Sequence, residues 1–344
     1  MKKPILSFIL IILIFCALLC GCGKMEPVSK TDIALDTIVS ITIYDVDSNV
    51  SSEQNLGDLS ITEKQEIAYS LIEQSINLTK HYEKLFSAYD EESDIYKINH
   101  GNGQPVLVDI TTIELVEKGI EFSKLSDGAF DITCGALNEL WHISDNTKDI
   151  PSKEEIATAL ETIDYNNIVI DKSASTIALK NPDTHIDLGA VAKGYIADEL
   201  KKYLVENGVS SGMINLGGNV LMIGGKLDDN ALIVGKKHFG NFNVGIAKPF
   251  SPEEICYTVS DKDKSVVTSG NYQRYFEKDG KIYHHIMDLS TGYPSDSGIS
   301  SATVISDKSL EGDALSTICF ILGKDKGEAF INAYNPDIKV HWEE

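Results

Sequence analysis

The sequence predicts an α+β protein whose sheets are mainly antiparallel. Strand-like and helix-like stretches are mixed along the 344 residues, without the regular strand–helix–strand alternation that is typical of a parallel sheet. The dipeptide Asp279-Gly280 lies between two β-rich stretches and indicates a two-residue hairpin turn. With 42% hydrophobic and 24% charged residues, the composition is that of a globular chain that can bury a large core.

The first strand is expected over residues 33–44, where apolar residues alternate with Thr and Val. Three helices are expected to begin at a Ser or Thr that is followed three positions later by Glu or Gln, the capping-box pattern: Thr62, Thr111 and Ser152. A further helix is predicted over residues 192–206, because its apolar residues follow helical spacing and Gly208 suits the position after its end.

The N-terminus is typical of an exported lipoprotein. Residues 1–21 have a cationic start and an apolar run, and they form a predicted signal peptide. The run ends in Leu19-Cys20-Gly21-Cys22, which resembles a lipobox, so Cys22 is the predicted lipidated N-terminus. A tether over residues 22–31 and one domain over residues 32–344 are expected to follow. An uncleaved membrane anchor is the alternative, although the run is slightly short for a span.

Either N-terminal anchor places the domain at the extracytoplasmic face of the cell membrane. The chain has 30 Lys and Arg against 52 Asp and Glu, a net charge of −22, and the predicted leader removes two lysines and no acid. This charge excludes nucleic acid as a partner and makes attraction to anionic lipid unfavourable. The acyl chains are therefore expected to hold the protein at the membrane.

Three cysteines lie beyond the processing region: Cys134, Cys256 and Cys319. They cannot all pair within the chain, and their spacing indicates neither a disulfide framework nor a zinc site. We therefore expect them to be buried free thiols.

Two segments combine glycine or small residues with charge. In IDLGAVAKGYIAD, residues 186–198, Asp187 and Lys193 lie just before and within the start of the expected helix, where backbone N–H groups and a lysine can bind an anion. A strand-to-helix turn with solvated charges is an equal alternative.

In GDALSTICFILG, Asp313 and Thr317 share a helix face suited to Mg²⁺. A dipole-stabilising Asp and a core-facing Thr explain that pattern better on its own.

Two adjacent histidines close the second strand of the predicted hairpin. Since neighbouring strand residues point to opposite faces, only one of His284 and His285 is expected to face a site. A neutral imidazole there is a candidate general base for a hydroxyl nucleophile. A structural histidine is the alternative.

Together and in this order, eight segments resemble the ApbE family, the FAD:protein FMN transferases, which are often bacterial lipoproteins. These segments run from residue 33 to residue 323: ALDTIVSITIY, LFSAYDEESDIYKIN, GAFDIT, IDLGAVAKGYIAD, INLGGNV, SVVTSGNYQRYF, HHIMDLSTGYP and GDALSTICFILG. The resemblance implies a T-fold-like α+β architecture with FAD bound in a cleft. It also implies Mg²⁺-dependent transfer of FMN from FAD to a threonine of an exported partner flavoprotein with an FMN-binding domain, through a phosphoester and with release of AMP.

The resemblance also assigns site residues. The implied metal ligands are the carbonyl of Ala190, the carboxylate of Asp313 and the hydroxyl of Thr317, and His285 is the implied base, with Asp313 as the other catalytic candidate. The implied FAD contacts are Leu35, Ser87, Ala88, Tyr89, Asp131, Asp187 and Lys193.

The chain departs from the family pattern at three places. Leu35-Asp36-Thr37 stands where the family usually has Met-Gly-Thr, and Ala136 and Leu289 replace usual prolines.

Two related activities stay open, because water and threonine attack the same phosphorus: an FAD pyrophosphatase that forms FMN and AMP, and a flavin-binding lipoprotein without transfer. A solute-binding lipoprotein is a third alternative, against which the Asp313 and Thr317 pair argues.

Overall fold

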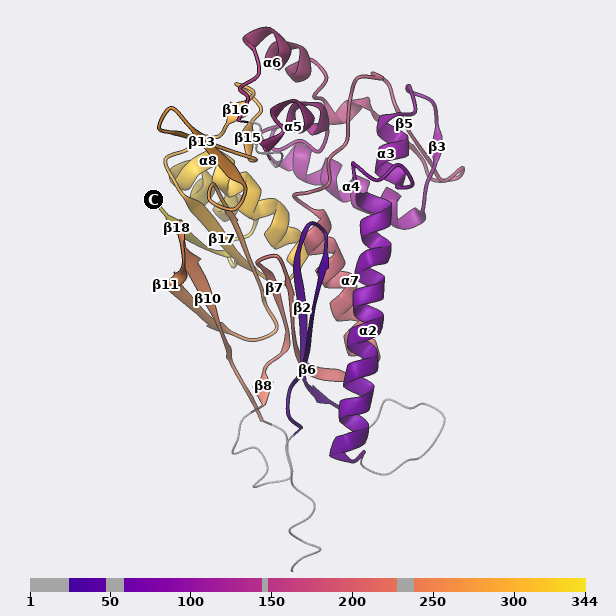
Figure 1. Cartoon of the computed structure of the whole chain (residues 1–344), viewed down its shortest axis with the longest axis vertical. Coiled ribbons are helices and arrows are strands. Elements are labelled where there is room, and N and C mark those ends of the chain that lie inside the picture. Colours follow the sequence, from indigo (N-terminus) through magenta and orange to yellow (C-terminus); the bar gives the residue numbers. More distant parts are fainter. Residues whose placement is uncertain (1–24, 48–58, 144–147, 228–237) are drawn as a thin grey trace, which may run out of the picture.

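A seven-stranded antiparallel sheet forms the centre of the protein (Figure 1). The computed structural model describes residues 25–47, 59–143, 148–227 and 238–344. The strand order is β1-β2-β6-β7-β12-β17-β18, and every neighbouring pair is antiparallel. The bounds are β1 Val28–Ala34, β2 Thr37–Val46, β6 Val209–Leu216, β7 Asn219–Gly224, β12 Ser265–Gly270, β17 Ser301–Ser306 and β18 Lys339–Glu343. The predicted α+β class with antiparallel pairing is confirmed.

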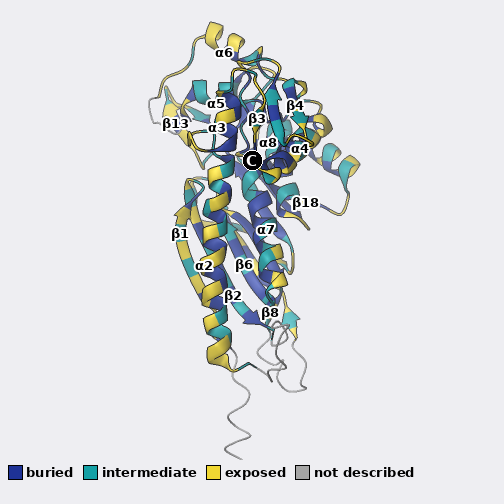
Figure 2. Cartoon of the chain, turned by 90° about the vertical axis from the view of Figure 1, so that its right-hand side faces the viewer, coloured by how far each residue is buried: buried dark blue, intermediate teal, exposed yellow. Residues whose placement is uncertain are grey.

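Three long helices cover one face of this sheet: α2 (Ile61–Phe86), α7 (Ala192–Glu206) and α8 (Ser309–Tyr334, with a kink at Gly323). Their buried side chains join sheet residues such as Ile41, Ile214 and Val304 in the largest apolar cluster. Figure 2 shows exposed residues along the outward side of α2, as expected for a helix that buries one stripe. Burial of that stripe, at about 25 cal/mol per Å² of apolar surface, holds the helix on the sheet.

A hairpin of β10 (Phe242–Lys248) and β11 (Ser251–Asp261) covers the other face of the sheet. Its apolar residues pack against Val220 and Met222 of β7, whereas Leu221 between them belongs to the first cluster. This division follows from the alternation of side chains along a strand. The middle of the central sheet is therefore buried on both faces.

The remaining elements form the other end of the molecule, around a small sheet of order β3-β5-β4 and a third apolar cluster that includes Trp141. The bounds there are α3 Asp94–Asn99, β3 Val106–Leu107, α4 Ile110–Leu125, α5 Gly135–Trp141, α6 Lys153–Leu160, η2 Tyr165–Asn167, β4 Ile168–Asp171, β5 Thr176–Leu179, β13 Tyr275–Lys278, β14 Lys281–His284, β15 Met287–Asp288 and β16 Tyr293–Pro294. A short pair, β8 (Lys226–Leu227) and β9 (Phe239–Gly240), lies beyond β7.

The sequence located helix starts to within two residues. Ser152 and Glu155 form the predicted capping box of α6, and α7 has the predicted bounds, with Gly208 at a φ of 86° after its end. The predicted box at Thr62 is wrong, because Ser60 caps α2 with Glu63. The prediction at Thr111 is wrong as well, since the side chain of Asp109 caps α4 and accepts the Thr111 N–H at 2.8 Å.

The expected single strand over residues 33–44 is two strands, β1 and β2, which form a hairpin. Leu35 and Asp36 make its two-residue turn, and their φ values are 56° and 52°. Both residues are thus in the left-handed region, where glycine is usual. The expected tether is also shorter than predicted, because residues 28–31 pair within β1 and Met25 is already buried.

Replacing Asp36 by Gly is expected to stabilise the protein, by about 0.5–1 kcal/mol, because glycine adopts a positive φ without the steric cost of a Cβ atom. The measurement is urea unfolding of both proteins. Asp36→Ala is the matched control and should destabilise, since alanine lacks the local hydrogen bonding that lets Asp tolerate this conformation. Equal stability of all three proteins would contradict the strained turn.

Within the described residues, no helix combines the length and the apolar character that a membrane span requires. The predicted signal peptide and Cys22 lie outside these residues, so the lipid anchor stays a prediction. Residues 25–344 contain the described helices and strands and all three apolar clusters, so this body has its own core without the leader.

Candidate active site

Helices α7 and α8 cap each other at their N-termini. In the described structure, neither N-cap residue, Val191 or Lys308, uses its side chain to cap its own helix. Instead, Asp313 Oδ2 of α8 accepts the N–H of Gly194 in α7 at 2.8 Å. The carboxylate of Asp198 in α7 accepts the N–H groups of the first two residues of α8, at 2.9 and 3.0 Å. Each helix therefore supplies hydrogen-bond acceptors to backbone N–H groups in the first turn of the other helix.

The close approach of α7 and α8 requires Gly194. A Cβ atom at this position would lie 2.4 Å from the carbonyl oxygen of Ser309 and 2.6 Å from Cα of Leu310, both of which are backbone atoms. Because backbone cannot rotate away as a side chain can, only glycine allows the two helix starts to meet at this distance.

Asp313 and Thr317 form a polar face on the first turns of α8. The Asp313 side chain is buried, which raises the pKa of its carboxyl, while the charge of Lys193 and the Gly194 N–H lower it. The Thr317 hydroxyl lies 3.1 Å from Ser269 Oγ on β12 and donates to the Asp313 carbonyl at 3.3 Å. The expected shared face is confirmed, and its donors are oxygen atoms.

The segment from Asp187 to Lys193 forms the loop and first turn at the start of α7. Asp187 accepts the N–H of Gly189 with one carboxylate oxygen and the side-chain amide of Asn138 with the other, both at 2.7 Å. Lys193 Nζ donates to the carbonyl oxygen of Gly189 at 2.9 Å. The loop is thus fixed by its own charged residues, and its ammonium group lies at a helix N-terminus.

Asp131 lies beside this loop, because the N–H of Asp187 donates to the carbonyl of Ile132 at 2.8 Å. Its buried carboxylate accepts the backbone N–H and hydroxyl of Thr133, at 2.9 and 2.7 Å, and the N–H of Tyr165 at 3.0 Å. Burial raises the pKa of Asp131, although these hydrogen bonds act to lower it. These contacts give Asp131 a structural role, and its contact with FAD stays a prediction.

The other predicted FAD residues lie around the C-terminal end of α2. Ser87 caps this end, and its hydroxyl accepts the N–H groups of Tyr89 and Asp90 at 3.1 Å. One turn earlier, Glu83 accepts the N–H of Leu35 at 2.5 Å and so fixes the tip of the β1–β2 hairpin. The end of α2 also packs against the start of α7, where Phe86 meets Tyr195 edge to face.

The two histidines have the different environments expected of them. His284 is buried, and its Nε2 lies 2.9 Å from the carbonyl oxygen of Ser295. His285 is half-buried, and its Nδ1 lies 3.3 Å from the carbonyl oxygen of Arg274, which favours the tautomer with the lone pair on Nε2. Burial and the charges of Arg274 and Lys193 lower the pKa of His285 to about 3.

Lys193 connects the parts of the site electrostatically, since its charge acts on both His285 and Asp313. The arrangement can bind an anionic group at the start of α7, hold a hard cation by oxygen donors and accept a proton on a neutral imidazole. These are the functions that phosphoryl chemistry requires.

Residues 35–342 match the ApbE family. The chain belongs to the ApbE family. The FAD:protein FMN transferase of Klebsiella pneumoniae is 36% identical over 260 residues, which cover 75% of this chain and 77% of that protein. The protein of the same name from Treponema pallidum is 29% identical over 330 residues, 92% of this chain and 86% of its own.

A solved ApbE structure agrees with the architecture. The ApbE protein of Thermotoga maritima superposes with a TM-score of 0.77 and 31% identity, covering 92% of this chain and 94% of its own. The ApbE fold predicted from the sequence is therefore confirmed.

Sequence reasoning missed four residues that shape this ApbE site: Asn138, Gly194, Asp198 and Ser269. Gly194 and Asp198 lie within the IDLGAVAKGYIAD segment, and Ser269 lies within the SVVTSG segment, so their motifs were recognised but not their roles. Asn138 had no local signal, because it reaches Asp187 across 49 positions of sequence.

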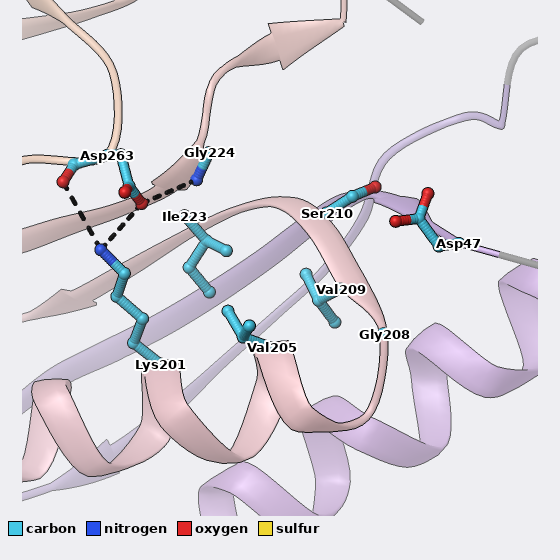
Figure 3. A pocket seen from close by; sticks show the side chains of 9 residues that line it. All are labelled: Asp47, Lys201, Val205, Gly208, Val209, Ser210, Ile223, Gly224 and Asp263. Atoms are coloured by element: carbon cyan, nitrogen blue, oxygen red, sulfur yellow. Dashed lines mark hydrogen bonds and ion pairs between the residues drawn. The ribbon is translucent and has the colours of Figure 1, made fainter. Parts of the chain in front are cut away.

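Two surface hollows of the described chain lie away from the ApbE site residues. One lies at the far end of α7, where Lys201 forms an ion pair of 2.8 Å with Asp263 (Figure 3). The other lies beside the kink of α8, next to Ser297 and Gly323. Neither is lined by a predicted site residue, and the expected FAD cleft stays a prediction.

Proposed function

We infer that this chain is an FAD:protein FMN transferase. The inference rests on membership of the ApbE family and on relatives of that name that are 36% and 29% identical over most of both chains. The observation that carries it within the structure is the buried Asp313 carboxylate at the start of α7, beside Thr317 and within the field of Lys193.

We propose that Mg²⁺ is bound by the carbonyl of Ala190, the carboxylate of Asp313 and the hydroxyl of Thr317. The donor set supports this, because Mg²⁺ prefers oxygen ligands and few protein ligands. The burial of Asp313 supports it too, since a buried carboxylate with a raised pKa gains charge compensation from a cation. A divalent ion at this position supplies stabilisation of the charge that develops on phosphate oxygens.

In the proposed reaction, a threonine hydroxyl of the acceptor protein attacks the phosphorus on the FMN side of the FAD pyrophosphate. The new P–O bond is a phosphoester, the bond to the AMP phosphate breaks, and AMP leaves. Lys193 binds pyrophosphate oxygens at the α7 N-terminus, where the helix dipole adds positive potential. His285 accepts the hydroxyl proton on Nε2, with Asp313 as the other candidate.

Replacing His285 by Gln is expected to lower kcat by about 10²- to 10⁴-fold, because the amide cannot accept the proton. Since the pKa of His285 is lowered to about 3, the imidazole is already neutral at pH 7 and remains so below the usual His pKa of about 6.5. The rate of the wild type should therefore show no His-dependent loss as the pH falls through 6.5. A pH–rate profile checks this, and a loss with an apparent pKa near 6.5 that His285→Gln removes would contradict the lowered pKa.

We propose that the protein works at the extracytoplasmic face of the membrane, anchored by lipid at Cys22. Its partner would then be an exported flavoprotein with an FMN-binding domain. The signal-peptide pattern and lipobox support this location, and the acidic composition disfavours nucleic acid as a partner.

The deciding experiment incubates residues 24–344 with FAD, Mg²⁺ and an acceptor flavoprotein domain, and it follows AMP release and acceptor mass together. We expect AMP release and an acceptor mass increase equal to FMN minus one water, and we expect EDTA to abolish both. An established ApbE enzyme acting on the same acceptor is the positive control.

Other outcomes assign the alternatives. AMP without a mass increase would make the chain an FAD pyrophosphatase, provided that the control enzyme modifies the acceptor. FAD binding without AMP would make it a flavin-binding lipoprotein, and no FAD binding would favour capture of another solute.

A further inference from the structure

Three side chains with metal-ligating atoms meet at the edge of the central sheet, on the face away from α7 and α8. They are Cys256 of β11 and His341 and Glu343 of β18, and one ligand atom from each lies within 4.8 Å of the others. His341 Nε2 and Glu343 Oε1 are 2.7 Å apart, and these two side chains are 25% and 26% exposed. The cluster is therefore accessible to an ion from solvent.

The backbone directs all three side chains to one place. His341 and Glu343 are two residues apart on a strand and so point to the same face, while Trp342 between them packs with the main core. Cys256 is the extra residue of a β-bulge, because Ile246 pairs with Tyr257 and Ala247 pairs with Ile255. Bulges redirect side chains and are common next to functional sites.

Contacts around the cluster hold the ligand groups in position. The ring of Tyr257 stacks on the ring of His341, with centroids 4.1 Å apart and an interplanar angle of 8°. The Cys256 thiol donates to the carbonyl oxygens of Ile246 and Ala247 on β10, at 3.4 and 3.6 Å. Lys248, the nearby cation, forms an ion pair of 2.8 Å with Glu254.

We propose that Cys256, His341 and Glu343 bind zinc or a similar divalent transition-metal ion. Thiolate, imidazole and carboxylate are the three ligand types that zinc uses, and three protein ligands leave a fourth tetrahedral position for water. The mixed sulfur and nitrogen donors exclude Mg²⁺ as the preferred ion. On binding, the Cys256 thiol gives its proton to solvent and the His341–Glu343 hydrogen bond opens to admit the ion.

The proposed ion joins two parts of the fold. Figure 1 shows the β10–β11 hairpin beside β17 and β18, and an ion bound by Cys256 and His341 would fasten this hairpin to the edge strand of the sheet. The site is separate from Asp313 and Thr317 and does not depend on the proposed function.

The experiment measures Zn²⁺ binding to residues 24–344 by competition with a chromophoric chelator, in excess Mg²⁺. We expect the wild type to bind one Zn²⁺ ion per chain tightly and to have a higher melting temperature with Zn²⁺. The Zn²⁺ affinity should be at least about 100-fold weaker in Cys256→Ser and in His341→Gln. Glu254→Gln is the matched control on β11 and should bind as the wild type does. Asp313→Asn should also bind this Zn²⁺ ion as the wild type does.

Cobalt gives a second readout that needs no variant. Co²⁺ bound to the wild type should show thiolate-to-cobalt charge-transfer absorption, because Cys134 and Cys319 belong to other parts of the fold. Absence of that absorption, wild-type Zn²⁺ affinity in Cys256→Ser, or no Zn²⁺ binding to the wild type would each overturn the proposal. In any of these cases the three side chains form only a hydrogen-bonded contact between hairpin and sheet.

Discussion

Replacing Asp313 by Ala is expected to reduce FMN transfer by on the order of 10³-fold. The change removes the charged oxygen ligand of the proposed Mg²⁺ site and also leaves the Gly194 N–H without its acceptor. The measurement is AMP release together with acceptor mass at saturating FAD, over a range of Mg²⁺ concentrations.

Asp313→Asn separates these two consequences. An amide oxygen still accepts the Gly194 N–H but carries no charge, so this variant should be nearly as inactive while it loses less stability than Asp313→Ala, which costs about 1–3 kcal/mol. Asp325→Ala, an exposed acid farther along α8, is the control and should keep full activity. Wild-type activity in Asp313→Asn would show that no cation depends on this carboxylate.

Replacing Gly194 by Ala is expected to lower the stability by about 3 kcal/mol. The added methyl group would overlap the backbone of Ser309 and Leu310, at 2.4 and 2.6 Å, so α7 and α8 must separate. The measurement is the midpoint of denaturant unfolding, together with FMN transfer by the fraction that stays folded.

Gly240→Ala is the matched control, because the nearest atom to its Cβ is 3.9 Å away. It should change the unfolding midpoint little. If Gly194→Ala were as stable as this control and remained active, the tight contact between the two helix starts would not be required.

The sequence predicted helix ends correctly where only one capping pattern was present near the end. The start of α6 and the end of α7 agree with prediction because Ser152, Glu155 and Gly208 act within one turn of the chain. At α2 two capping patterns overlap by two residues, and the chain uses the one at Ser60, where Glu63 returns a hydrogen bond to the cap. The turn at Leu35 and Asp36 was missed because it contains no Gly or Pro.

Long-range contacts explain most of what sequence reasoning missed at the site. Asp313 was recognised as a candidate ligand, but its hydrogen bond to Gly194 joins residues 119 positions apart. The cluster at Cys256 was missed for a related reason, since cysteine spacing alone cannot show a bulge or the approach of β18. Spacing had predicted three buried thiols, whereas Cys134 and Cys256 are half-buried and Cys319 is buried. Patterns along the chain find residues, and only the fold shows their partners.

The reciprocal capping of α7 and α8 has a consequence for how this enzyme can evolve. The carboxylate that is proposed to ligate the metal also completes the hydrogen bonding of a core helix, so one residue serves both chemistry and folding. A substitution that adapts the site to another substrate at this position must therefore also lower stability, unless a second change compensates.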